Sequence, residues 1–115
     1  MTAVAVVVLC TAPADGDASK PGAAALARQL VEERLAACVN VLPGVQSFFH
    51  WEGKVDAAFE SLLMIKTMPA LLPALRQRLL QLHPYQVPEV LELNVDGGSP
   101  QYLRWLADAV APARQ

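Results

Sequence analysis

Cys10 and His83 combine two side chains whose chemistry suits a soft transition metal. A cysteine thiolate and a histidine imidazole are together typical ligands of copper or zinc. The sequence contains no CxxC, HxH or HExxH motif, so the spacing alone gives a weak metal signal. A purely structural role therefore stays open for each of the two residues. A cysteine at a strand end is commonly a small buried hydrophobe, and a histidine before proline commonly ends a helix.

A second group of polar residues, Lys66, Tyr85 and Glu89, could hold a ligand or move a proton. Lys66 lies near the end of an apolar segment. Its ammonium either reaches the sheet margin or points into a cleft between subunits, to meet an anion or Glu60. The three residues could in principle supply acid–base catalysis. No nucleophile–base pair, nucleophile elbow or phosphate-binding loop accompanies them, so we do not expect an enzyme.

An aromatic run, Phe48, Phe49 and Trp51, lies just before a predicted hairpin turn. Its first interpretation is packing within the hairpin. An aromatic cage around a ligand is the alternative.

Four strands and three helices are expected to position these side chains. Segments rich in β-branched residues alternate with segments whose apolar residues recur at spacings of three and four. Ser19, Thr67 and Ser99 are the expected N-caps, each followed by a proline in the first turn. The expected strands are 3–10, 38–51, 55–67 and 89–95, and the expected helices are 19–35, 67–82 and 99–110.

This order, β-α-β-β-α-β-α, is that of a ferredoxin-like α+β sandwich with an added C-terminal helix. Right-handed crossovers then give an antiparallel sheet in the order 4-1-3-2, with the helices on one face. Segments 3–10 and 61–66 are apolar on both faces, so the second face needs a cover, and the hairpin is long for one small domain. These features predict a homo-oligomer that pairs strands between subunits.

The topology also predicts which chemical groups meet. Cys10 ends the first strand and Cys38 begins the second, which places them at opposite ends of the sheet, roughly 20 Å apart, too far for a disulfide. The loop before the fourth strand returns to the Cys10 end. His83, Tyr85 and Glu89 are therefore expected near Cys10.

A three-residue turn at 52–54 sets the expected pairing of the long hairpin. It would place Gln46 opposite Glu60 and Asn40 opposite Lys66, within one residue, because Pro43 interrupts the strand and indicates a bulge.

Composition narrows the class of protein. The chain has 115 residues, of which 54% are hydrophobic and 17% charged, and its net charge is −2. We expect one domain over 1–115, and no nucleic-acid partner, because a basic footprint is lacking. The longest apolar run, 3–10, is too short to cross a membrane and lacks the flanks of a signal peptide. Two cysteines outside any CxxC pair favour a cytoplasmic protein with reduced thiols.

Seven segments, in order and correctly spaced, resemble those of the CutA1 divalent-cation tolerance proteins. The resemblance runs from about Val6 to Ala107, which is nearly the whole chain. Any one segment is weak, but their common order and spacing make the match specific. The segments are Val8–Pro13, Leu35–Asn40, Pro43–Gly44, Trp51–Lys54, Ile65–Thr67, His83–Glu89 and Tyr102–Trp105.

The resemblance implies a ferredoxin-like homotrimer, similar in assembly to the PII signalling proteins. It further implies a cytoplasmic role in tolerance of divalent metals, copper above all. Cys10 and His83 match the positions at which bacterial relatives are described as binding copper. Leu82 stands where some relatives carry a second histidine, so one candidate ligand is missing here.

The family pattern also implies a pocket between subunits. Trp51, Lys66, Tyr85 and Glu89 match its signature polar and aromatic positions, and Glu60 is added as the carboxylate that Lys66 could meet. The alternative function is accordingly that of a PII-like sensor trimer, which binds a small anionic ligand at the subunit interfaces.

Overall fold

The structure, a computed structural model, describes residues 3–112 and has the α+β architecture expected from the sequence. Four strands and three helices follow one another in the order β-α-β-β-α-β-α, with a short 3-10 turn before the second helix. The elements are β1 (Ala5–Ala12), α1 (Ala23–Glu32), β2 (Cys38–Trp51), β3 (Lys54–Thr67), η1 (Pro69–Leu71), α2 (Leu72–Leu82), β4 (Leu91–Val95) and α3 (Pro100–Ala109).

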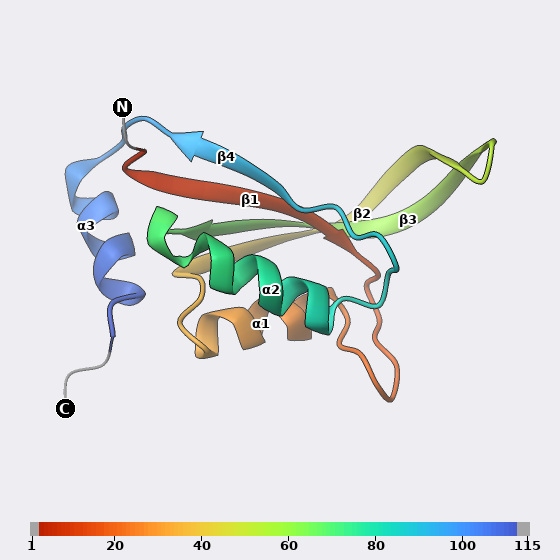
Figure 1. Cartoon of the computed structure of the whole chain (residues 1–115), viewed down its shortest axis with the longest axis horizontal. Coiled ribbons are helices and arrows are strands. Elements are labelled where there is room, and N and C mark those ends of the chain that lie inside the picture. Colours follow the sequence, from red (N-terminus) through yellow and green to blue (C-terminus); the bar gives the residue numbers. More distant parts are fainter. Residues whose placement is uncertain (1–2, 113–115) are drawn as a thin grey trace.

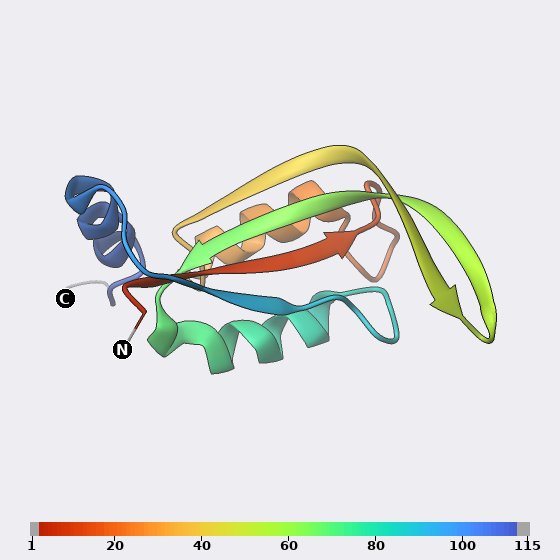
Figure 2. The ribbon, with the colours of Figure 1, turned by 90° about the horizontal axis from the view of Figure 1, so that it is seen from above.

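The four strands form one antiparallel sheet in the order β2-β3-β1-β4, which confirms the predicted order. Helices α1 and α2 cover one face, α1 beside β2 and β3 and α2 toward β4, whereas α3 lies at one end of the sheet (Figures 1 and 2). At the other end the β2–β3 hairpin extends well beyond the helices (Figure 1). The molecule is correspondingly elongated, with extents of 46 × 32 × 23 Å.

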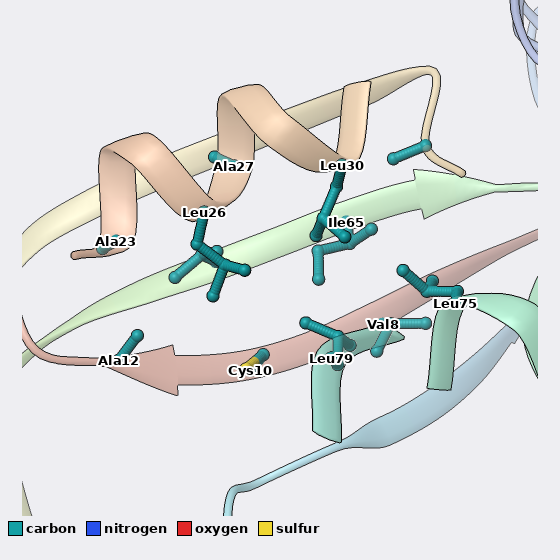
Figure 3. Close-up of a cluster of buried hydrophobic side chains, with 12 residues drawn as sticks. Val8, Cys10, Ala12, Ala23, Leu26, Ala27, Leu30, Ile65, Leu75 and Leu79 are labelled. Carbon is teal, nitrogen blue, oxygen red and sulfur yellow. The ribbon is translucent and has the colours of Figure 1, made fainter. Parts of the chain in front are cut away.

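The core lies between the sheet and the two helices. Alternate residues of β1 and β3 point into it, among them Val8, Cys10 and Ile65, and they meet the apolar stripes of α1 and α2 (Figure 3). Leu26 of α1 and Leu79 of α2 are fully buried there. The strand alternation and the helical stripes read from the sequence therefore form this core.

The second face of the sheet carries apolar side chains that the single chain leaves partly open. Val7, Leu9 and Met64 are half-buried on this face, and the neighbouring Leu91 and Leu93 of β4 are 54% and 48% exposed. The need for a cover over this face, inferred from the sequence, is thus apparent in the structure.

Helix α1 begins later than expected. Its N-cap is Gly22, not Ser19, and it ends at Glu32. The Ser19 N–H and hydroxyl instead donate to Asp17 Oδ1 in a local turn, since a short hydroxyl side chain competes well for such contacts outside a helix. Thr67 likewise does not cap the second helix, because its hydroxyl donates to the Leu35 carbonyl and its residue remains in β3.

The predicted hairpin register is correct within its stated one residue at Glu60 but two residues off at Lys66, and the bulge was correctly expected. Glu60 lies opposite Val45 and Lys66 opposite Cys38, with the irregularity between Leu42 and Val45. The turn has only two residues, Glu52 and Gly53, both with positive φ, as a tight turn between twisted strands requires. The shorter turn and the bulge together shift every pair that had been counted from a three-residue turn.

The two cysteines also lie closer together than expected. Cys10 of β1 pairs with Leu63 and Cys38 of β2 pairs with Lys66, and these two partners lie three residues apart along β3. Since β3 lies between β1 and β2, the two cysteines are about 14 Å apart. The estimate of 20 Å was too large because β1 continues for two residues beyond Cys10. Both thiols are free.

Candidate functional site

The segment after α2 crosses the end of β1 and is held there by His83. The His83 Nε2 atom lies 2.7 Å from the Thr11 carbonyl oxygen, and the Tyr85 backbone N–H donates to His83 Nδ1 at 3.1 Å. A backbone N–H can only donate and a carbonyl can only accept, so Nδ1 carries the lone pair and Nε2 carries the proton. His83 is 3% exposed, and burial lowers the pKa of its imidazole.

Cys10 lies beside this histidine but faces the core (Figure 3). Its thiol donates to the same Thr11 carbonyl at 3.7 Å. Because both groups share one acceptor, Cys10 Sγ and His83 Nε2 lie within about 6.4 Å of each other. Burial, reinforced by the negative charges of Glu89 and Glu60, raises the pKa of the thiol to about 12, so it stays protonated at neutral pH.

Glu60 is a buried carboxylate, 7% exposed, at the point where the hairpin leaves the domain. Its two oxygens accept separate hydrogen bonds, from the Ser47 hydroxyl at 2.6 Å and from the Tyr85 hydroxyl at 2.8 Å. Burial and the neighbouring carboxylate raise the pKa of Tyr85 to about 12, so the phenol is neutral and remains a donor. Glu60 therefore joins both hairpin strands to the loop that carries His83.

These contacts form one end of a groove of about 820 Å³ between the hairpin and the loop that follows His83. Opposite partners in an antiparallel pair share a face. One face of the hairpin therefore forms the groove floor, and loop residues 85–89 form the facing wall. The floor residues on that face are Ser47, Phe49, Trp51, Asp56, Ala58 and Glu60, and Phe48 and His50 of the other face also line the groove.

Four of the five residues predicted for a pocket between subunits lie together in this groove. Trp51, Glu60, Tyr85 and Glu89 all line it. Lys66 does not, because it lies six residues along β3 from Glu60, about 20 Å away. Its ammonium instead lies 5.8 Å from the centre of the Tyr102 ring of α3. A meeting of Lys66 with this groove therefore requires a second copy of the chain.

Two groups that the sequence did not single out complete the site. Ser47 supplies a hydroxyl to Glu60, and the Thr11 carbonyl binds both His83 and Cys10. Ser47 could have been found from strand alternation, because it shares a face with Phe49 and Trp51. A backbone carbonyl leaves no signal in a sequence.

The residues present do not form a ready metal site within one chain. Across residues 3–112, no three His, Cys, Asp or Glu side chains are placed to hold a metal ion together. The Cys10 thiol is protonated, and both nitrogens of His83 already take part in hydrogen bonds. Metal binding by this pair requires loss of the thiol proton and release of one histidine nitrogen.

No helix within residues 3–112 is both long enough and apolar enough to span a bilayer.

Known proteins share both the sequence and this fold. The family model described as "CutA1 divalent ion tolerance protein" matches residues 6–109. A divalent-cation tolerance protein CutA from Pectobacterium atrosepticum is 48% identical over 102 residues, which cover 89% of this chain and 88% of the relative.

Two solved structures extend the likeness to three dimensions. The divalent cation tolerance protein from Thermus thermophilus superposes with a TM-score of 0.81 at 43% identity, over 91% of this chain and 97% of that one. A protein from Nostoc sp. PCC 7120, described as PII-like, superposes with a TM-score of 0.81 at 32% identity, over 92% and 97%.

Proposed function

The chain belongs to the CutA1 family of divalent ion tolerance proteins, and from this premise we propose that it is a cytoplasmic homotrimer that binds divalent metal, copper foremost. Cys10 and His83 are the proposed donors. The family is described by ion tolerance and not by a reaction, and we propose no catalytic activity.

Exposed apolar surface supports the assembly. Phe48, Val55 and Phe59 of the hairpin are 67%, 70% and 74% exposed in the single chain. An isolated two-stranded ribbon is at best marginally stable in water, so a hairpin this apolar gains from pairing with a neighbour. Together with the open second face of the sheet, it offers each subunit two surfaces to bury.

Native mass spectrometry tests the proposed trimer. We expect a species near 37 kDa, three times the chain mass of 12.4 kDa, and a monomer at micromolar concentration contradicts it.

One observation carries the metal proposal: Cys10 and His83 share the Thr11 carbonyl as acceptor. A metal between sulfur and nitrogen requires donor atoms roughly 3.5–4.3 Å apart, given bond lengths of about 2.3 and 2.0 Å. The two donor atoms are at most about 6.4 Å apart, so they would have to approach each other by at most about 2–3 Å. A single thiolate with a single imidazole suits a soft ion of low coordination number. Among the metals proposed, this favours copper, bound as the monovalent copper(I) to which divalent copper is reduced in a compartment that keeps thiols reduced.

The experiment has a control built into the composition, because the chain has two cysteines and two histidines. Copper(I) affinity is measured by competition with a chromogenic chelator for Cys10→Ser with His83→Gln, and for the matched pair Cys38→Ser with His50→Gln. We expect only the first pair to lose binding, by at least a hundredfold. Equal affinity of the two double variants contradicts the donor assignment.

Fractionation of cells that express the chain tests the proposed cytoplasmic location. Recovery of the protein in the periplasm would contradict it.

The groove favours a second candidate function, a PII-like sensor that binds a small molecule between subunits. Its volume of about 820 Å³ is within the range of small-molecule sites. An anionic ligand requires a cation, and Lys66 of a second copy is the residue proposed to supply it. Thermal shift against nucleotides and small organic acids tests this candidate. A stabilisation that disappears in Lys66→Met supports it, and no shift with any of these anions contradicts it.

A further inference from the structure

The lining of the groove is acidic and aromatic. Among its lining residues within the described chain, Asp56, Glu60 and Glu89 are carboxylic and none is lysine or arginine. Glu60 is more than nine-tenths buried and accepts only hydroxyl donors, and none of the ion pairs formed among residues 3–112 includes it. Burial makes the charge of a carboxylate unfavourable when no cation is beside it. Binding of a positive charge next to Glu60 would therefore be favourable.

The distribution of these carboxylates selects the kind of cation. A divalent metal ion needs several oxygen ligands within about 2.0–2.6 Å. Across residues 3–112 no three acidic, histidine or cysteine side chains are grouped closely enough for that. Asp56 lies opposite Phe49 near the hairpin turn, whereas Glu60 lies opposite Val45, four residues further along the strand. Charges spread over a groove of about 820 Å³ match an extended organic cation better than a metal ion.

Aromatic rings supply the rest of the contact. Phe49, Trp51 and Tyr85 line the groove, and they are 38%, 44% and 36% exposed, so their rings are accessible within it. Trp and Tyr faces attract ammonium groups, and such rings form the cages that recognise organic cations. The hydroxyl of Tyr85 is already committed to Glu60, which keeps this ring fixed beside the carboxylate.

From the buried carboxylate, the aromatic floor and the lack of a lysine or arginine among the described lining residues, we propose that this groove binds a small organic cation, an ammonium attached to a flat apolar group. The ammonium lies against Glu60, and the flat group lies between the hairpin aromatics and loop 85–89. The proposal does not depend on metal binding at Cys10 and His83. It is the alternative to the anion-binding sensor, in which Lys66 of a second copy enters the same groove.

The test uses the assembled protein and three probes that share one ring: benzylammonium, benzyl alcohol and benzoate. Trp105→Phe removes the second of the two tryptophans, so fluorescence then reports on Trp51 alone. We expect saturable quenching by benzylammonium, with affinity at least tenfold above that of the alcohol and no binding of benzoate. Equal binding of the alcohol, or preference for benzoate, overturns the proposal. So does an absence of benzylammonium binding, which is also the result if a lysine of a second copy fills the groove.

Charge-removing variants locate the site. Glu60→Gln keeps the shape and can still accept a hydroxyl, and we expect about a tenfold loss of benzylammonium affinity. Glu32→Gln removes the same charge from an exposed position on α1 and should leave the affinity unchanged. Equal losses in the two variants overturn the assignment. Glu89→Gln is the second variant if Glu60→Gln does not assemble, and unchanged affinity in it then counts against the site. Copper(I) affinity, measured on the same variants, separates this proposal from the metal proposal.

Discussion

A thiol that is fully buried and must stay protonated makes the fold sensitive to alkaline pH. Cys10 has no exposed surface, and its pKa is raised from an ordinary value of 9.0 to about 12. The unfolded chain therefore releases this proton at lower pH than the native state does. The stabilisation is complete below pH 9 and is lost as pH rises through 12.

The two pKa values set the size of the effect. Between pH 8 and pH 11, ionisation of this thiol in the unfolded chain lowers the free energy of unfolding by about 2.6 kcal/mol, at 1.36 kcal/mol per pKa unit. That is a large share of the stability of a domain of this size. Any metal that binds Cys10 at neutral pH must displace the same tightly held proton.

Urea unfolding at both pH values measures the effect. The assay compares Cys38→Ala with Cys38→Ala plus Cys10→Ala, at one fixed protomer concentration and in the presence of a reductant. The cavity left by Cys10→Ala costs the same at both pH values, and the other titrating groups are common to both proteins. We expect the protein that retains Cys10 to lose about 2.6 kcal/mol more. A difference below about 0.5 kcal/mol would refute the reasoning, because the thiol would then ionise as readily in the fold as in the unfolded chain.

Three further outcomes follow from the same contacts. Tyr85→Phe removes one of the two hydrogen-bond donors to the buried Glu60, and should lower the free energy of unfolding measured in urea by about 1–3 kcal/mol. Tyr102→Phe is the control at an exposed tyrosine, and should change this free energy by less than about 0.5 kcal/mol. Acid should destabilise the fold as pH falls below 6.5, because the lowered pKa of His83 makes the unfolded chain bind the proton before the native state does. His83→Gln should flatten this part of the plot of unfolding free energy against pH. An unchanged plot would contradict the lowered pKa of His83. Iodoacetamide at pH 8 should alkylate the half-buried Cys38 well before Cys10, as peptide mass spectrometry can show, and the reverse order would place Cys10 at the surface.

The architecture was accessible from the sequence because its signals are local and repeated. Alternation in β1 and β3 and stripes at three- and four-residue spacing in α1 and α2 predicted the layers, and right-handed crossovers then left one strand order. The residues at which helices and strands begin and end were harder to predict from the sequence. Ser19 has the chemistry of an N-cap, but the hydrogen bonds from its N–H and hydroxyl to Asp17 decide that it lies outside the helix.

The candidate site shows the same division. Residue types and topology predicted that His83, Tyr85 and Glu89 return to the end of the strand that carries Cys10. The grouping of Trp51 with Glu60 and the loop then became visible as a groove. The register was not predictable, since one residue fewer in the turn changes every cross-strand neighbour.

The sequence by itself determined the family, the order of the elements and the side chains able to do chemistry, because these depend on residue type and spacing along the chain. The tertiary structure alone decided which of those side chains are chemically available. The Cys10 thiol is held protonated in the core, and both nitrogens of His83 are occupied. Glu60 is buried beside aromatic rings with no lysine or arginine among the described groove-lining residues, whereas Lys66 lies against α3. Burial, shared acceptors and local charge depend on what surrounds a group in three dimensions, and that is set only when distant segments pack together.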